Sequence, residues 1–371
     1  MQTHYSSRLT VLFSSLRRLA ARLKGRSPQR FLSFLSTGFV LSLLLAFVST
    51  GFSACSVVDN GNVVELTLVS NAVTEAAYRE IMPLFAADWE QKHQQKVVFN
   101  QSYGGSGTQA RAVIEGLPAD IVDLGLELDV EKIEAAGLIQ PGWQDRVPNG
   151  AIAHQSVAAL VTRSGNPKSI STWADLAQNG VSVITANPHT SGGARWNFLA
   201  LWGSITQAGG DQQTALNYTT QVFENIPILP KDAREATDAF FQQGQGDVLI
   251  NYENEIILAK LNGQDIPYLV PETNISIDNP VAVIDANVDQ HGTREVAEAF
   301  VQFLFTPAAQ REFARFGFRP VDEAINTEFA DQFPPVTNLF TIADLGGWNT
   351  VQQKFFDEGG VFDQIQADLT K

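Results

Sequence analysis

The chain has 371 residues, of which 44% are hydrophobic and 18% charged, which is an ordinary composition for a globular protein of about two domains. Residues 1–55 carry seven basic residues and no acid, so subtracting them from the net charge of −15 leaves −22 on the rest. The acidic part of the chain after residue 55 should repel nucleic acid and anionic membrane surfaces, which argues against both as partners. Any anion site must therefore act through donors aimed at one point.

The N-terminus has the pattern of an export signal. A basic stretch ends at Arg30, and the uncharged, mostly apolar residues 31–54 follow it, which is the order of a secretory signal peptide. The run FSAC that ends at Cys55 resembles a bacterial lipobox. We therefore expect residues 1–54 to be a signal peptide and the mature protein to be periplasmic, tethered to the membrane through lipidated Cys55. The alternative is an uncleaved anchor, because about 20 apolar residues span a bilayer.

Cysteine and histidine usage limits the chemistry. Cys55 is the single cysteine, which excludes an intramolecular disulfide and a zinc site of the zinc-finger type. The five histidines form no i, i+4 pair, so the sequence predicts no metal site and no cofactor.

Strands and helices alternate along the mature chain. Hydrophobic periodicity predicts strands over residues 63–70, 96–100, 121–126, 157–162, 181–185, 248–251 and 281–284. It predicts helices over residues 74–92, 108–115, 130–136, 173–178, 194–202, 294–304 and 307–316.

This alternation indicates an α/β protein whose mainly parallel sheets are flanked by helices. The strands over 157–162 and 281–284 are candidates for two crossings between lobes. We expect residues 55–156 and 281–371 to form a discontinuous lobe I that includes the C-terminal helices, and residues 157–280 to form lobe II.

A glycine-rich turn follows the second strand. Residues 102–107 (SYGGSG) lie at a strand-to-helix junction, where glycines let the backbone turn and expose its N–H groups. The first N–H groups of the next helix are unpaired and carry partial positive charge, so they can bind an anion without a charged side chain. Ser106 adds a hydroxyl donor. The competing interpretation is a plain loop with an N-cap serine.

The same arrangement recurs after the strand 181–185. Ser191 offers a hydroxyl, and Gly192 and Gly193 offer N–H groups where the helix 194–202 begins. Two such ends on different lobes can face one ligand in the cleft between them, a common location for small-ligand sites.

From about residue 64 to residue 366 the chain closely resembles bacterial periplasmic sulfate-binding proteins, most of all their cyanobacterial branch. The resemblance is carried by the runs YGGSG, SVITANPHTSGGARWNFLALWG, DAREATDAF, GQGDVLINYENE, GTREVAEAFVQFLF, GFRP, LFTI and LGGW. It implies a two-lobed type II periplasmic-binding-protein fold that captures sulfate in its cleft. It further implies delivery to the permease and ATPase subunits of an ABC importer by a monomer that is not an enzyme.

The resemblance also implies the donors to the ligand. Matched position by position, they are the N–H and hydroxyl of Ser106, the hydroxyl of Ser191, and the N–H groups of Gly192, Gly193 and Ala233. Ala233 follows from the resemblance alone.

Two further positions depart from the family pattern. Ala72 stands where the family often has an aspartate whose backbone N–H lies near the ligand, and that donor survives the change. Tyr252 stands where the family often has a tryptophan donor, and a phenol donates from a different position. Thiosulfate or another oxyanion is therefore the alternative ligand.

Charged neighbours bear on the choice of anion. Sulfate offers only acceptors, whereas protonated phosphate is better matched by a carboxylate. We expect Asp232 and Glu235 to be solvated surface acids, and Arg195 and Arg234 to lie behind the ligand positions rather than to contact the anion. Trp196 is expected in the core.

Two other classes of function remain open from the residues. A phosphatase or sulfatase needs a nucleophile with a nearby base or metal ligands, and His189 is the one histidine close to Ser191 in the sequence. A surface adhesion or sensor protein can use the same fold without a transport partner.

Overall fold

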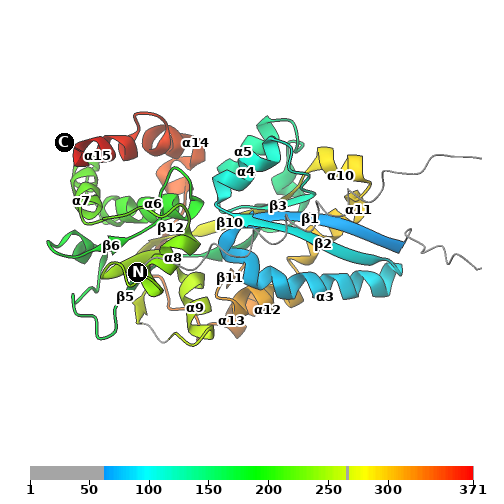
Figure 1. Ribbon diagram of the computed structural model, residues 1–371, viewed down its shortest axis with the longest axis horizontal. Coiled ribbons are helices and arrows are strands. Elements are labelled where there is room, and N and C mark those ends of the chain that lie inside the picture. The colour runs from blue at the N-terminus through cyan, green and yellow to red at the C-terminus, as the bar shows by residue number, and fades with distance from the viewer. Residues whose placement is uncertain (1–61, 265–266, 371) are drawn as a thin grey trace, which may run out of the picture. The chain divides into compact units, whose positions relative to one another are not determined.

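The computed structural model describes residues 62–264 and 267–370, so the expected signal peptide and Cys55 lie outside the described residues. All described residues fall in one compact unit, Asn60–Lys371. Within the described part of the chain, none of the helices has the length and apolar character needed to cross a membrane. Two main sheets, each flanked by helices, organise this unit (Figure 1).

The first lobe is defined here as the larger sheet and the helices packed on it. Its strand order is β11-β4-β10-β3-β1-β2, and β10 and β11 run against the other four strands. The strands are β1 (Val63–Asn71), β2 (Lys96–Gly104), β3 (Ile121–Asp123), β4 (Ile152–Ser156), β10 (Ile277–Val283) and β11 (Arg319–Pro320). The helical segments are η2 (Ala72–Thr74), α3 (Glu75–His93), α4 (Ser106–Ile114), α5 (Glu127–Ala135), η3 (Trp143–Arg146), η4 (Asn149–Ala151), α10 (Asp285–His291), α11 (Arg294–Phe303), α12 (Pro307–Arg315) and α13 (Glu323–Glu328).

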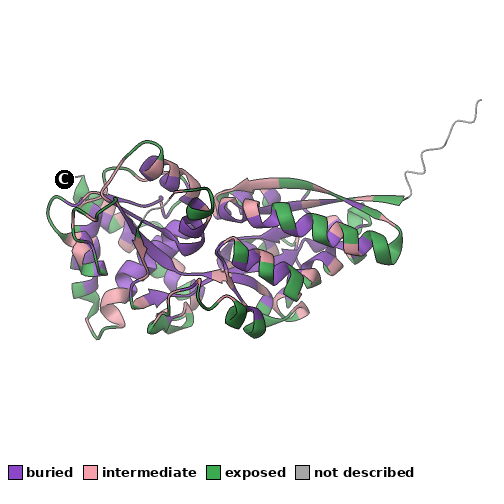
Figure 2. Ribbon diagram, turned by 90° about the horizontal axis from the view of Figure 1, so that it is seen from below, coloured by how far each residue is buried: buried purple, intermediate pink, exposed green. Residues whose placement is uncertain are grey.

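Alternation along the strands divides the first lobe into two apolar layers. Leu66 and Leu68 of β1 join the cluster that contains residues of α3, α11 and α12, whereas Val69 joins the cluster of α4 and α5. Successive side chains of a strand point to opposite faces, so one strand supplies both layers. Figure 2 shows the result, with buried strands and exposed residues on the outer faces of the helices.

The second lobe is defined here as the smaller sheet and the helices packed on it. Its strand order is β6-β7-β5-β8, and β5 runs against the other three. The strands are β5 (Ala158–Thr162), β6 (Val183–Ile184), β7 (Val248–Tyr252) and β8 (Tyr268–Leu269). The helical segments are η5 (Trp173–Ala177), α6 (Gly192–Thr206), α7 (Gln212–Glu224), α8 (Ala233–Phe241) and α9 (Glu253–Leu261).

The chain passes between the two sheets at two points. Only Val157 separates β4 from β5, which belong to different sheets. The chain returns at Ser276, just before β10, after the short strand β9 (Thr273–Ile275). The strand expected over 281–284 lies inside the first sheet, where Val281 pairs with Asp123, because β10 already pairs with β4 from Ile277 onward.

The C-terminal segment makes aromatic contacts with helices of the second lobe. It contains β12 (Asn338–Phe340), which pairs with β9, and then η6 (Ala343–Leu345), α14 (Gly347–Val351), η7 (Gln352–Phe356) and α15 (Val361–Leu369). Phe362 packs against Phe198 of α6 and Phe223 of α7, with ring centroids 6.0 and 5.7 Å apart. Phe355 packs 5.0 Å from Trp202 of α6. The apolar face of this segment thus finds its aromatic partners on the second lobe rather than on lobe I.

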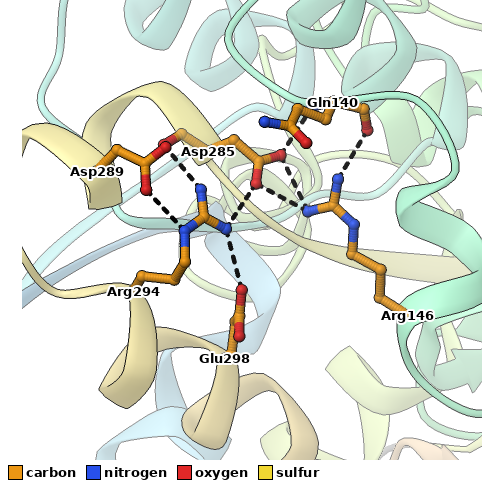
Figure 3. A network of polar contacts seen from close by, with 6 residues as sticks. All are labelled: Gln140, Arg146, Asp285, Asp289, Arg294 and Glu298. Carbon is orange, nitrogen blue, oxygen red and sulfur yellow. Dashed lines mark hydrogen bonds and ion pairs between the residues drawn. The ribbon is translucent and has the colours of Figure 1, made fainter.

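An ion-pair network joins the end of the first sheet to the helices that follow it (Figure 3). Asp285, the first residue of α10, accepts hydrogen bonds from Arg146 at 2.9 Å and from Arg294 at 2.8 Å. The backbone N–H of Gln140 donates to Asp285 at 2.7 Å, and Arg294 also pairs with Asp289. Burial opposes ionisation of Asp285, but these donors outweigh it and lower the pKa of its carboxyl.

We expect Asp285→Asn to lower the free energy of unfolding by about 2–3 kcal/mol at pH 7. This is somewhat less than the loss for a fully buried ion pair, because the side chains of Arg146 and Arg294 remain about one third exposed. The matched control Asp289→Asn removes a carboxylate that is 60% exposed and should cost less than about 1 kcal/mol.

The contribution of Asp285 has a definite pH dependence. Because its pKa is lower in the folded state, the stabilisation is complete above the ordinary aspartate pKa of about 3.9 and is lost as the pH falls through the lowered value. Thermal unfolding at pH 7 and at pH 3 measures this. A difference between the Asp285→Asn variant and the wild type that is as large at pH 3 as at pH 7 would contradict the assignment.

Candidate functional site

Two parallel strands of the first lobe end side by side at the site. Asn71 at the end of β1 pairs with Gly104 at the end of β2. Asn71 then caps η2, which begins at Ala72, and Gly105 caps α4, which begins at Ser106. The helix α4 starts two residues earlier than expected, so Ser106 is its first residue and offers one of its unpaired N–H groups.

The helix α6 of the second lobe starts opposite this edge. It begins at Gly192, again two residues earlier than expected, with Ser191 as its N-cap. The Ser191 Oγ accepts a hydrogen bond from the N–H of Ala194 at 3.3 Å, which leaves its hydroxyl proton free for an acceptor in the site. Gly192 and Gly193 are therefore the first two residues of a buried helix.

Two more helices of the second lobe begin at the same place. The helix α8 begins at Ala233 after its N-cap Asp232, and α9 begins directly after Tyr252, the last residue of β7. Hydrophobic periodicity did not predict either helix.

One small cavity brings together every ligand residue expected from the sequence. Its volume, measured with a water-sized probe, is about 10 Å³, far below the roughly 300–1,000 Å³ of sites for drug-sized ligands. The expected residues that line it are Ala72, Ser106, Ser191, Gly192, Gly193, Ala233 and Tyr252. Gly104 and Gly105, from the glycine-rich turn 102–107, and Asp232 also line it, together with Asn71 and Val73, for which no sequence pattern gave a signal.

Several backbone donors at this cavity have no partner among residues 62–264 and 267–370. Among the described residues, no acceptor is found for the N–H groups of Ser106, Gly192, Gly193 or Ala233. A buried donor left unpaired costs about 1–3 kcal/mol. Four such donors around one cavity therefore favour a ligand that is rich in hydrogen-bond acceptors.

The same geometry brings partial positive charge to the cavity. The first residues of α4, α6 and α8 line it, and each helix N-terminus carries a partial positive charge of about half a unit. No lysine or arginine is among the described residues that line the cavity. The arrangement can hold a small anion through dipoles alone.

The two nearby arginines form hydrogen bonds and an ion pair with other residues of the protein. Arg195 donates to the carbonyl of Pro188 at 2.8 Å and to Gln352 at 2.8 Å. Arg234 makes a bidentate ion pair with Glu255, with N–O distances of 2.8 and 2.9 Å.

Ser106 differs from expectation in its side chain. Its hydroxyl donates to the buried carboxylate of Asp129 at 2.7 Å and accepts from the N–H of Gly125 at 3.1 Å. The hydroxyl proton is therefore directed at Asp129 and not at the cavity, because a carboxylate is the stronger competitor for a hydroxyl donor. Ser106 contributes its N–H group in this arrangement.

Asp232 also differs from expectation. It is only 6% exposed and lines the cavity, so it is not a solvated surface acid. The reason is local, because Asp232 caps the buried start of α8 by accepting from the N–H of Glu235 at 2.9 Å. Glu235 itself pairs with Lys231, and both of these side chains are exposed, as expected for Glu235.

Tyr252 supplies a neutral donor. Its side chain is buried and lines the cavity, and within the described residues its hydroxyl has no hydrogen-bond partner. Burial, with added repulsion from the carboxylates of Glu255 and Asp129, raises the pKa of this phenol well above its ordinary value. The hydroxyl therefore keeps its proton at physiological pH.

Lack of space for a side chain explains two of the glycines, Gly105 where the lobes approach each other and Gly193 within the second lobe. A Cβ on Gly105 would lie 2.7 Å from the backbone oxygen of Thr190, and a Cβ on Gly193 would lie 2.6 Å from the Tyr252 ring. Gly105 has φ −63° and ψ 134°, which any residue adopts, so space and not backbone conformation requires glycine there.

The histidine considered for an enzymatic role lies apart from the cavity. His189 pairs with Asp363 at 3.0 Å, packs against Phe362, and is about half exposed. It is not among the residues that line the cavity.

Known proteins share this chain's sequence and fold. The family model for bacterial extracellular solute-binding proteins matches residues 66–319. The sulfate-binding protein of Synechococcus elongatus is 59% identical over 308 residues, which cover 83% of this chain and 88% of the relative. The thiosulfate-binding protein of Escherichia coli is 35% identical over 309 residues, 82% of this chain and 91% of the relative.

The chain belongs to the bacterial extracellular solute-binding proteins. Its fold agrees with a solved structure, the sulfate-binding protein SubI from Mycobacterium tuberculosis, with a TM-score of 0.73 at 38% identity over 79% of this chain and all of that one. This confirms the expected two-lobed fold. Membership of an extracellular family places this solute-binding protein in the periplasm, and the role of the family is to bind solutes for transport, not to catalyse a reaction.

Gly105→Ala should weaken anion binding by this solute-binding protein about 5- to 100-fold, because the new methyl group meets a backbone oxygen that cannot move aside, and overpacking typically costs about 1–3 kcal/mol. Gly107→Ala, two residues along the same helix, is the control, since its Cβ meets only the Asp129 carboxylate at an ordinary 3.9 Å. Calorimetric titration with sulfate as the probe anion measures both. Equal affinities for the two variants would contradict the packing argument.

Proposed function

We propose that this chain captures sulfate between its two lobes and delivers it to the permease and ATPase of an ABC importer. The observation that carries the proposal is a set of four backbone N–H groups without a partner in the described part of the chain, those of Ser106, Gly192, Gly193 and Ala233. They surround a cavity that no described lysine or arginine lines. The high identity to a sulfate-binding relative supports the same ligand.

The chemistry of the lining suits a fully ionised oxyanion. Sulfate presents only acceptors, and the backbone N–H groups, the Ser191 hydroxyl and the Tyr252 hydroxyl present donors. Among the described lining residues, Asp232 is the one acid. One oxygen of its carboxylate accepts a hydrogen bond from the N–H of Glu235 at the start of α8. A protonated phosphate also needs a hydrogen-bond acceptor in the site, and the other carboxylate oxygen of Asp232 would have to supply it.

Thiosulfate is the second candidate ligand. A thiosulfate-binding relative is 35% identical over most of its length, against 59% for the sulfate-binding relative. Tyr252 lines the cavity where the family often has a tryptophan. A phenol hydroxyl donates from a different position than an indole N–H, so Tyr252 bears on the choice between sulfate and thiosulfate.

We further propose that the lobes close on the anion by a hinge motion about the two crossings at Val157 and Ser276. The lining comes from both lobes, so bound anion favours the closed state over the open one. The contacts of the C-terminal segment support a boundary that assigns it to the second lobe.

Purified protein should bind sulfate with micromolar or tighter affinity, with thiosulfate next and phosphate far weaker. Because every donor is neutral and the pKa of Tyr252 is raised, sulfate affinity should stay constant from about pH 5 to pH 9. Isothermal titration calorimetry with each anion, in buffers free of oxyanions, measures this. Moderate sodium chloride should change the affinity little.

Three outcomes would contradict this proposal. Absence of heat with sulfate and with thiosulfate rejects the function. Phosphate binding that weakens as rising pH removes its proton identifies Asp232 as an acceptor and reassigns the ligand. A steep fall of affinity with salt points to a cation in the site.

We also propose that export removes residues 1–54 and that Cys55 becomes the lipidated N-terminus, which tethers the protein to the membrane. The support is the charge pattern of the N-terminus and the lipobox-like run FSAC.

Expression in a bacterial host should yield a mature chain that starts at diacylated Cys55, and Cys55→Ser should release the protein into the soluble periplasmic fraction. Mass spectrometry of the N-terminal peptide reads out the modification. A mature N-terminus at any other residue, or an unmodified Cys55, overturns the lipoprotein assignment.

A further inference from the structure

A hydrogen bond links the two lobes beside the cavity but outside it. The indole N–H of Trp196 donates to the backbone carbonyl of Gly125 at 2.6 Å. Trp196 lies on α6 of the second lobe, three residues after Gly193, whereas Gly125 lies between β3 and α5 of the first lobe. Trp196 is fully buried and is not among the residues that line the cavity.

Gly125 connects this bond to the wall of the anion site. While its carbonyl accepts from Trp196, its N–H donates to the Ser106 hydroxyl at 3.1 Å, and that hydroxyl donates to Asp129 at 2.7 Å. The loop that receives the indole therefore also holds the first residue of α4 in place. A Cβ on Gly125 would lie 3.3 Å from the Tyr252 hydroxyl, so the lobes meet tightly at this point.

The indole is held rigidly in its orientation. Trp348 of the C-terminal segment packs edge-on against Trp196, with ring centroids 4.8 Å apart and an interplanar angle of 76°. Trp348 belongs to α14, which also contacts α5 of the first lobe. The donor is thus aimed at Gly125 by packing and not only by its own hydrogen bond.

We propose that Trp196 is a positioning residue that sets the balance between the open and closed states without touching the anion. The inference rests on the proposed function. The anion enters an open cleft, and the Trp196–Gly125 bond forms only when the lobes meet. The bond therefore adds to the stability of the closed complex and not to the first encounter.

This role predicts a kinetic signature. Loss of an interaction that exists only in the closed state speeds dissociation and leaves association unchanged. Trp196→Phe keeps an aromatic ring in the core and removes the N–H group. The expected effect is a dissociation rate about two- to tenfold faster, the range for one net hydrogen bond, with an association rate within about twofold of the wild type.

Trp202→Phe is the matched control. Trp202 lies on the same helix, is 3% exposed, and packs against Phe355 within the second lobe. The same substitution there perturbs the core to a similar degree without touching Gly125, so it should lower the melting temperature and leave both rate constants for sulfate within about twofold. Stopped-flow measurements on the wild type and both variants, with melting temperatures recorded, compare them.

A second measurement does not depend on how well a variant packs. In the wild type, the indole N–H resonance of Trp196 should shift on addition of sulfate, because closure gives it a carbonyl acceptor. If the wild type binds sulfate but the Trp196→Phe variant dissociates no faster than the Trp202→Phe variant, or the indole resonance does not respond, the positioning role is wrong while the proposed function stands. If the wild type binds no anion, both fail together.

Discussion

The site depends on the convergence of helix N-termini from two lobes on one buried point. Each terminus brings unpaired N–H groups and partial positive charge, and these stay where the backbone of the helix places them. Residues 56–371 carry a net charge of −22, so they cannot attract an anion by their net field. They can hold one by local dipoles, because the effect of a dipole is strong at close range in a site that excludes water.

That convergence requires backbone to approach backbone, which explains where the glycines lie. Gly105 faces the carbonyl of Thr190 across the cleft, and Gly193 faces the ring of Tyr252, with no room for a methyl group at either position. The two sheets make such an approach possible, because each ends its parallel strands at the edge that faces the cavity. The crossings at Val157 and Ser276 then connect the two halves without filling the space between them.

Sequence patterns predicted the strands and helices that carry the first two donor sets, because periodicity and glycine-rich junctions are local signals. The start of α6 at Gly192 is an example, because the predicted start differs from it by only two residues.

Ala233 could not be predicted from its own residue type, because a methyl side chain gives no signal that the backbone N–H is a donor. Only the family resemblance indicated it. The direction of the Ser106 hydroxyl could not be predicted from the sequence either. Its acceptor Asp129 lies 23 residues away along the chain and comes close only in the folded protein. The burial of Asp232 follows from the placement of α8, which local patterns did not assign. The aromatic contacts of the C-terminal segment with α6 and α7 could not be predicted from the sequence, because they join residues that are far apart along the chain.

We propose that neutral donors, and not a cation, hold the anion. A crystal structure of the protein with bound sulfate tests this proposal. We expect sulfate oxygens at about 2.7–3.2 Å from the backbone nitrogens of Ser106, Gly192, Gly193 and Ala233, with Arg195 and Arg234 still turned away. A guanidinium, an ammonium or a metal ion in contact with the sulfate would contradict it.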